Sequence, residues 1–572
     1  SWLLDDDGHW LWSTSAMREV MRLLVSLGPI LTVDHMQRLQ DAIVKGPPRT
    51  RFRDDISDDD FERFSDRMRW LRLKKLLSNG GTATENAHAF MASIEEHYSE
   101  WELATDEREE FPMWSSNGAD IVEEQLPRDF EGLVARLREK PSVDDLHAPD
   151  NWAKICKDNS DLAMEVLKKL SEDDHWYPQR WEQALYAWAN DENNSRTWQH
   201  IAPALVEMPD SIFAEAVHAI SWWVSRISKN VGEHVEEFFT LVDRIIDAST
   251  TTVEDFDDFS LIHVMNHPVG HAASSLLNWW FSMELEDDQE LPDELSDRFA
   301  KMCKADSQPL WIGSVILAQQ VIPLLRVDQD WTKQYLIPSF EWAPDVTKAA
   351  AIWDSFLHAP RIYLPLLELL KSPFLEVPDH IDDLKEQCLE QYARFLTYIA
   401  LSEASVFSSS ELKEVFTKLT AEYLETVAET LFRALQSSGE QQEEYLTNRV
   451  IPFVNSFWPS KPEARAPETF RYFAQMAAVS RNGFEEAFAC FKNHLGQTAE
   501  FSYLLHLLED GGLAADHPSE ILSLLNATIP QDVPYLYGGL GPLLDIIQGA
   551  NPALSNHPHF NRLTVLSQQH ED

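Results

Sequence analysis

The stretch DSIFAEAVHAISWWVSRISK, residues 210–229, decides the fold class. Its apolar residues recur at the spacing of one face of an α-helix: Phe213, Val217, Ile220, Val224 and Ile227. Asp210 or Ser211 stands where a side chain can cap the first turn. The pattern predicts one amphipathic helix over 210–229, and such a helix buries its apolar face only against neighbouring elements.

The same period returns along most of the chain. Asn159 or Ser160 precedes a helical pattern over 162–170, and Ser408 with Glu411 forms a capping box before another. Gly439 stands where a left-handed residue would end that second helix. No sustained alternation predicts strands, and only 19 of 572 residues are glycine, which disfavours a turn-rich β architecture.

Prolines separate these amphipathic segments at Pro209, Pro268, Pro292, Pro309, Pro344, Pro360 and Pro373. Their spacing predicts helix pairs of roughly 35 to 50 residues, the length of HEAT-like repeats. The expected fold is all-α, an irregular α-solenoid of HEAT-like helix pairs. We divide it into an N-terminal helical connecting region (1–118), a central helical-repeat region (119–375) and a C-terminal one (376–572).

Charge limits the classes of partner. The chain has 95 acidic and 47 basic residues, a net charge of −48, so its field repels nucleic acids and anionic lipids. We therefore expect protein partners, without general nucleic-acid binding or membrane attachment. A salty habitat and mimicry of DNA remain alternative explanations of the acidity.

The cysteines and the hydropathy pattern indicate a cytoplasmic protein. Four cysteines lie far apart with no CxxC pair, as is usual for thiols in a reducing compartment: Cys156, Cys303, Cys388 and Cys490. No apolar run reaches the 18 residues that a membrane-spanning helix needs.

One segment is locally basic. Residues 67–77, RMRWLRLKKLL, contain five cations on a predicted amphipathic helix: Arg67, Arg69, Arg72, Lys74 and Lys75. We expect this helix to dock on acidic neighbours of its own fold.

Three histidines four residues apart, His263, His267 and His271, are the candidate metal ligands. On an unbroken helix this spacing would place three imidazoles on one face, as a zinc or iron site requires. Pro268 interrupts such a helix, because proline has no backbone donor and clashes with the preceding turn. We therefore expect one helix to end near Val264, Asn266 or His267 to act as a cap, and a second helix to begin at Pro268. This interpretation predicts no metal site.

Other catalytic patterns are absent from the sequence, including GxxxxGK[ST], GxGxxG after a strand, HExxH and GxSxG. The acidic run in DEREEFPMWSSNG, residues 106–118, is contiguous, whereas a metal nuclease needs acids converging from separate elements. There we expect a structural corner with Phe111 and Trp114 buried as a pair. We accordingly predict no catalytic residue and no cofactor in this chain.

Trp222 and Trp223 are candidate structural or partner-contact residues. Because Ile220 and Val224 occupy the core stripe, at least one of the two adjacent rings must point away from it. Burial against the next repeat and contact with a partner are both open, since exposed tryptophan is enriched at binding hot spots.

Six segments resemble the helical C-terminal region of large bacterial sirtuin-like antiphage defence proteins: WLRLKKLLSNGG (70–81), DEREEFPMWSSNG (106–118), NHPVGHAASSLLNWW (266–280), WTKQYLIPSFEW (331–342), AAIWDSFLHAPRIYLPLLELLKSPFL (350–375) and HPHFNRL (557–563). The resemblance runs from about residue 60 to the C-terminus. It implies a parent protein whose N-terminal sirtuin-like domain degrades NAD, a phage protein as a partner and a homo-oligomer formed through the parent. The glycine-rich NAD-binding motif and the catalytic histidine of a sirtuin are absent here.

Two functions are therefore expected. The first is a non-catalytic sensor and scaffold arm that recognises a phage component and controls a sirtuin-like NAD-degrading domain outside this chain. The alternative is a general helical-repeat protein–protein adaptor unrelated to immunity. Because Ser1 is not a methionine, we expect the chain to be part of a longer protein, which favours the first.

Overall fold

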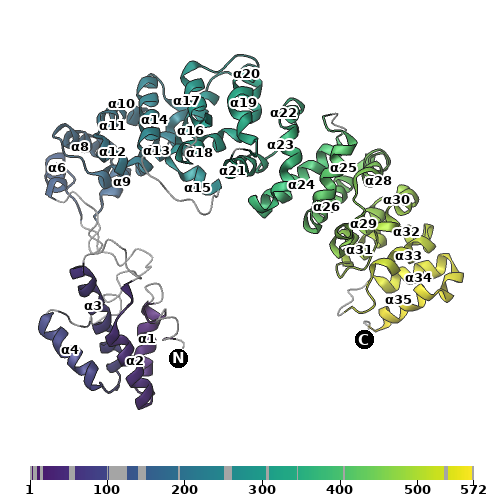
Figure 1. Ribbon diagram of the computed structural model, residues 1–572, viewed down its shortest axis with the longest axis horizontal. Helices are drawn as coiled ribbons and strands as arrows, with labels where there is room; N and C mark the ends of the chain where they lie inside the picture. The colour runs from purple at the N-terminus through teal and green to yellow at the C-terminus, as the bar shows by residue number, and fades with distance from the viewer. Residues whose placement is uncertain are drawn as a thin grey trace. The chain divides into compact units, whose positions relative to one another are not determined.

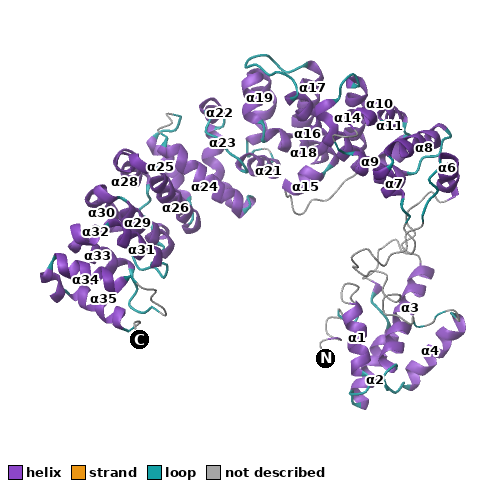
Figure 2. Cartoon of the chain, turned by 180° about the vertical axis from the view of Figure 1, so that it is seen from behind, coloured by secondary structure: helices purple, strands orange, loops and turns teal. Residues whose placement is uncertain are grey.

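A computed structural model describes residues 3, 10–12, 17–49, 58–98, 101, 103, 125–139, 150–190, 194–249, 261–304, 308–343, 345–402, 406–533 and 539–569. Helices account for nearly all regular structure in these ranges, and no strand is present among them (Figure 2). The predicted all-α fold is confirmed. The chain divides into two compact units, unit 1 (Ser1–Gln125 with Val143–Asn151) and unit 2 (Leu126–Ser142 with Trp152–Asp572). The three-region division stays a prediction.

Unit 1 is a small helical bundle with its own core. Its described helices are α1 (Met17–Leu27), α2 (Val33–Lys45), α3 (Asp58–Leu77) and α4 (Glu85–His97) (Figure 1). Thr32 and Thr84 cap α2 and α4 through their side-chain oxygens. Trp70, Leu73 and Leu76 of α3 are buried among residues of the other three helices.

The cations of α3 contact aromatic rings and a backbone carbonyl as well as acids, whereas the sequence predicted acidic neighbours alone. The Arg72 guanidinium lies 4.7 Å from the Trp12 ring centroid and donates from Nε to the Leu11 carbonyl at 2.8 Å. Arg67 and Arg69 lie over Trp70 and Phe90. Lys74 pairs with Glu95 of α4 at 2.5 Å, and Arg69 pairs with Asp66 of its own helix. Aromatic faces attract cations, and charge patterning alone cannot distinguish them from carboxylates as partners.

Unit 2 contains the rest of the described helices around one continuous core. Its first half comprises α6 (Phe130–Glu139), α7 (Trp152–Asp158), α8 (Ser160–Glu172), α9 (Pro178–Trp188), α10 (Asn194–His200), α11 (Ala202–Glu207), α12 (Asp210–Glu215), α13 (Val217–Ile227), η4 (Ser228–Asn230), α14 (Val235–Ser249), α15 (Leu261–Asn266), α16 (Pro268–Phe281), α17 (Asp293–Lys304), α18 (Gln308–Ala318), α19 (Val321–Val327), α20 (Gln329–Trp331), η5 (Thr332–Leu336) and η6 (Ile337–Phe340).

The second half comprises α21 (Val346–Leu357), α22 (Leu364–Leu369), α23 (Lys371–Glu376), η7 (Val377–Asp383), α24 (Glu386–Leu401), α25 (Ser409–Lys418), α26 (Ala421–Ser437), η8 (Gly439–Gln441), α27 (Gln442–Tyr445), η9 (Leu446–Val450), α28 (Ile451–Phe457), η10 (Pro462–Arg465), α29 (Pro467–Val479), η11 (Arg481–Gly483), α30 (Phe484–Phe491), η12 (Lys492–His494), α31 (Ser502–Gly511), α32 (Leu513–Asp516), α33 (Pro518–Thr528), α34 (Leu540–Ala550), η13 (Pro552–Asn556) and α35 (Pro558–Gln568).

A row of helices runs through unit 2, and each member contacts the next: α9, α13, α16, α18, α21, α24, α26, α29 and α31 (Figure 1). Other helices pack beside this row, as α14 does against α13 and α16, and α17 does against α18. The capping box at Ser408, the cap at Asn159 and the left-handed Gly439 are confirmed. Neighbour-to-neighbour packing is typical of helical repeats.

Two helices expected to be continuous are interrupted. The predicted helix 210–229 begins after Pro209, without a side-chain cap, and bends at Ala216 between α12 and α13. The segment after Ser408 breaks between Lys418 and Ala421. Backbone hydrogen bonds continue across Ala216, and Phe213 and Ile220 are both buried. The apolar stripe is preserved across the bend, so its period gives no sign of the interruption.

Two π turns occur in unit 2, and the same dipeptide follows each of them. Thr332–Leu336 and Leu446–Val450 are each followed at once by Ile-Pro, at Pro338 and Pro452. Proline offers no N–H to the carbonyl four residues earlier and clashes with it. The wider π turn relieves that clash before the next helical segment begins.

Cations cap the C-terminal ends of helices that precede them by one helix pair. Arg244 donates to the carbonyls of Leu205, Val206 and Met208 at 2.5–2.8 Å, and 36 to 39 residues separate donor from acceptor. Three further cations do the same at α17, α25 and α33: Lys348, Lys461 and Arg562. Each satisfies carbonyls that a helix end leaves without an intrahelical donor.

Buried tryptophan side chains also connect neighbouring elements, by donating hydrogen bonds to backbone carbonyls. Trp188 Nε1 donates to the Cys156 carbonyl at 2.9 Å, and Trp353 Nε1 donates to the Phe340 carbonyl at 3.0 Å. Trp342 reaches the Pro373 carbonyl at 2.9 Å. Among the tryptophans that the structure describes, only Trp10 is strongly exposed. Most of these rings therefore contribute to the core and not to a binding surface.

No single helix in the described ranges is long and apolar enough to cross a membrane. One pair, Pro309–Ala318 with Val321–Val327, satisfies length and composition together, but its two parts are bent by 78°.

Candidate functional site

The three spaced histidines lie at a helix junction. α15 ends at Asn266 and α16 begins at Pro268, with His267 as the N-cap between them. His267 Nδ1 accepts a hydrogen bond from the Val269 amide at 3.1 Å. The predicted break at Pro268 is confirmed, so His263 and His271 belong to different helices.

Gly270 explains how closely the two helices meet. A Cβ atom at this position would lie 1.9 Å from the carbonyl oxygen of Val264 in α15. No side chain fits there without displacing the backbone of the neighbouring helix. The junction is therefore tightly packed, and Val264 and Val269 are fully buried in it.

His271 connects α16 to α13. Its side chain is only 6% exposed, and its Nδ1 lies 3.0 Å from the Ser221 hydroxyl oxygen. Nε2 of His271 is buried and makes no hydrogen bond within the described structure. Burial, followed by the proximity of His218, lowers the pKa of His271 to about 4. The imidazole is therefore neutral near pH 7.

His267 has the same electrostatic character. Burial lowers its pKa to about 4, and the next contributions come from His218, His263 and His271. The junction thus assembles four histidines, and the sequence spacing pointed to only three. His218 comes from α13, 45 positions before His263 in the numbering, so only tertiary packing brings it in.

The histidines do not form a metal centre in the described structure. Within those ranges, no group of three or more His, Cys, Asp or Glu side chains has an arrangement that could hold a metal ion. Within the junction, the buried and uncharged side chains of His267 and His271 help to connect α15 and α16 with α13.

Trp222 and Trp223 have different environments. Trp223 is fully buried, and its ring centroid lies 5.1 Å from that of Trp198. Trp222 is half-buried, with its ring edge-on to His271 of the next helix in the row at 5.6 Å. Of the two candidates, Trp222 alone keeps an accessible edge.

Beside this junction lies a surface that we call the α9–α13–α15 face. It comprises Glu182 and Tyr186 of α9, Glu215 of α12, Trp222 of α13, and Ile262 and Met265 of α15. Partial burial raises the pKa of Glu182, and nearby Glu215 raises it further. Of these residues, only Trp222 was predicted from the sequence. The apolar periodicity of an amphipathic helix identifies the residues of its buried face and not those of its exposed face.

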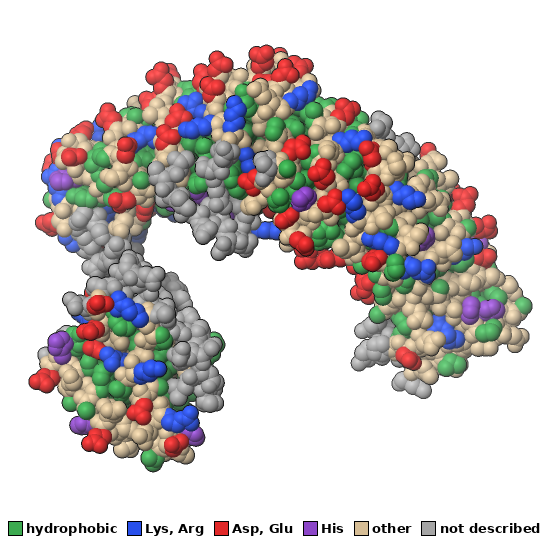
Figure 3. Space-filling model, viewed as in Figure 1, with side chains coloured by type: hydrophobic (Ala, Val, Ile, Leu, Met, Phe, Trp, Pro, Cys, Tyr) green, Lys and Arg blue, Asp and Glu red, His purple; other side chains and the backbone are tan. Residues whose placement is uncertain are grey.

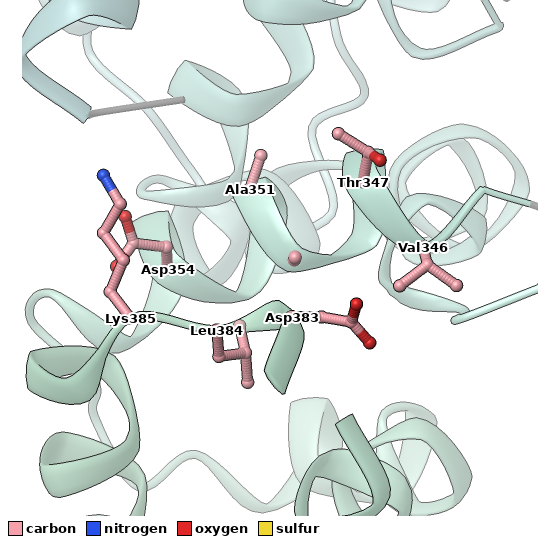
Figure 4. A pocket seen from close by; sticks show the side chains of 8 residues that line it. Val346, Thr347, Ala351, Asp354, Asp383, Leu384 and Lys385 are labelled. Carbon is pink, nitrogen blue, oxygen red and sulfur yellow. The ribbon is translucent and has the colours of Figure 1, made fainter. Parts of the chain in front are cut away.

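Two small pockets lie in the second half of unit 2. The first, about 130 Å³, lies between α21, η7 and α24, where Lys385 runs alongside Asp354 and Asp383 points away from them (Figure 4). Burial raises the pKa of Asp354, and Lys385 and His358 partly offset this. The second, about 290 Å³, is lined by residues of α24, α25, η9 and α28 together with Phe407. Both are below the usual volume of pockets that enclose a ligand.

Phe111 and Trp114, predicted to form a buried pair, lie outside the described residues, as does the acidic run beside them. Their proposed structural role therefore stays a prediction.

Comparison with known proteins assigns no family. No family model matches the chain, and no curated protein matches it. Among solved structures, the crystal structure of an engineered protein from the Northeast Structural Genomics Consortium is similar over 77% of this chain and 96% of its own, with 14% identity and a TM-score of 0.18. A similarity at this TM-score carries no argument about fold or function.

Proposed function

We propose that unit 2 is an irregular α-solenoid of HEAT-like helix pairs that acts as a non-catalytic scaffold for a protein partner. The observation that carries this proposal is the continuous row of packed helices from α9 to α31. Successive helices in such a row present a broad surface, which suits protein partners better than small molecules.

The charge of the chain supports a partner with basic or amphipathic character. The net charge is −48, and acidic side chains are spread over the visible face of unit 2 among fewer cations (Figure 3). Electrostatic attraction of this kind raises the association rate and weakens as salt is added.

The sequence resemblance gives the proposal its specific form. In that form the chain is the sensor arm of an antiphage defence protein, recognises a phage component and controls a sirtuin-like NAD-degrading domain outside residues 1–572. The general adaptor remains the second candidate, because the helical row supports both equally.

An infection experiment separates the two candidates. Bacteria carrying the native gene, and bacteria expressing residues 1–572 alone, are infected with phage while cellular NAD is measured. The sensor proposal predicts NAD loss with the native gene and none with residues 1–572 alone. Unchanged NAD in both strains, with no domain encoded upstream of Ser1, would leave only the adaptor.

A further inference from the structure

The α9–α13–α15 face contains large apolar side chains that solvent reaches. Ile262 is 73% exposed, and Tyr186 and Met265 are each just over half exposed. Ile262 and Met265 lie on a six-residue helix of which only Val264 is fully buried. Isolated exposed apolar residues are ordinary, but a group next to a half-buried tryptophan is typical of an interaction surface.

These side chains belong to elements that are linked through α13 and α16. α9 contacts α13, and α13 contacts α16, whose junction with α15 holds the histidines. His218 and Trp222 of α13 are both adjacent to that junction, since His218 affects the pKa of His267 and Trp222 touches His271. α15 is therefore linked to α13 through the start of α16.

The carboxylates of this face differ from three acids of unit 2 that pair with arginines. Asp161, Asp210 and Asp243 pair with Arg196, Arg244 and Arg298 at 2.6–3.0 Å. Glu182 and Glu215 lie close enough to repel one another, and no ion pair joins either one within the described structure. Arg226 lies 5.8 Å from the Trp222 ring centroid and eleven residues beyond Glu215.

We infer that the α9–α13–α15 face binds a segment of a partner protein in which an apolar side chain stands beside a lysine or arginine. The cation would lie between Glu182 and Glu215, and the apolar side chain would cover Ile262 and Met265 against the edge of Trp222. This inference rests on the proposed scaffold function and names its binding surface.

Physical chemistry favours this occupant. A bound cation relieves the repulsion between Glu182 and Glu215. Binding also removes the apolar surface of Ile262 and Met265 from water, which is favourable. His267 and His271 do not oppose the cation, because both are uncharged near pH 7. An acidic segment would instead meet two unpaired carboxylates.

The test uses a defined probe, a fluorescently labelled amphipathic helix of leucine and lysine about 18 residues long. Fluorescence anisotropy measures its dissociation constant for the full chain and for each variant. Ile262→Asp and Met265→Asp should each weaken binding about tenfold or more, since each places a carboxylate on the apolar contact. Glu182→Gln combined with Glu215→Gln should weaken binding and reduce its dependence on salt.

Matched controls lie elsewhere on unit 2. Val565→Asp in α35 changes an exposed apolar residue, and Glu440→Gln combined with Glu444→Gln removes two exposed acids. A second peptide keeps the lysines and replaces each leucine with serine, which separates charge from apolar contact. Circular dichroism of each variant confirms that the helices are intact.

The outcomes separate the inference from the function on which it rests. The inference is supported if only the face variants lose affinity and the intact chain binds the leucine–lysine peptide more tightly than the serine–lysine peptide. Equal binding by face and control variants overturns this surface and leaves the scaffold function standing. No binding of either peptide by the intact chain overturns the inference, and the scaffold function is then judged separately by the infection experiment.

Discussion

Two regions of unit 2 differ in whether their charged side chains have a bonding partner. At the helix ends capped by Arg244, Lys348, Lys461 and Arg562, each cation satisfies backbone carbonyls of a preceding helix. On the α9–α13–α15 face, Glu182 and Glu215 stay close together without an ion pair in the described structure. Four of the 47 cations of this chain therefore stabilise helix ends.

This difference distinguishes side chains that stabilise the fold from side chains that we propose bind a partner. Changes to the capped helix ends should reduce stability, because they leave buried carbonyls without donors. Changes to the exposed face should leave stability nearly unchanged and alter binding instead.

The largest stability effect is expected in the core between helix pairs. Trp353→Ala should reduce the free energy of unfolding by about 3–5 kcal/mol, since the ring is fully buried and packs against Phe340 and Phe356. Chemical denaturation followed by circular dichroism measures the change. Trp222→Ala, at a half-buried ring, is the matched control and should cost clearly less. Equal costs for the two would contradict the assignment of Trp222 to the surface.

A smaller loss is expected at a capped helix end. Arg244→Met keeps the aliphatic stem but removes the donors to Leu205, Val206 and Met208, and should cost about 2 kcal/mol. Amide hydrogen exchange should rise most in α11. Arg433→Met, at an exposed arginine paired with Glu429, is the control and should have little effect. If both changes have the same small effect, the capping argument fails.

The histidine junction predicts a dependence of stability on pH. Folding lowers the pKa of His267 and His271 from 6.5 to about 4, so the unfolded chain binds protons more readily. Their contribution is complete above pH 6.5 and is lost as the pH falls from 6.5 toward 4. His271→Gln should flatten this slope in urea titrations between those values, whereas His200→Gln, at an exposed site, should not. An unchanged slope for His271→Gln would contradict the prediction.

The smallest expected effect has the opposite sign. Glu182→Gln should raise the free energy of unfolding slightly, by no more than about 0.5 kcal/mol after solvent screening, because it removes a partly buried charge beside Glu215. Asp210→Asn should lower it slightly, since Asp210 pairs with Arg244 at 2.8 Å. Thermal unfolding of the two variants side by side tests the difference in sign, and a loss in both would contradict it.

Much of the fold was predictable because it depends on local chemistry. The helical period, the caps at Asn159 and Ser408, and the break before Pro268 follow from residues close together in the sequence. The bend at Ala216 was not predictable, because the apolar stripe continues across it.

The candidate site was predicted less well, since it depends on packing between helices. His218 and Ser221 approach His271 only when α13 lies against α16. Similarly, Glu182 comes near Glu215 only when α9 lies beside α12. The abundance of tryptophan suggested exposed anchors, whereas most described rings are buried in the core.

The central claim is that the α9–α13–α15 face binds partners while the capped helix ends hold the repeats together. Hydrogen–deuterium exchange of the full chain, with and without the leucine–lysine peptide, tests it most directly. We predict added protection at 178–188, 217–227 and 261–266, with no change at 518–528 or 558–568. Protection spread evenly over unit 2, or centred on the capped ends of α11 and α33, would contradict the claim.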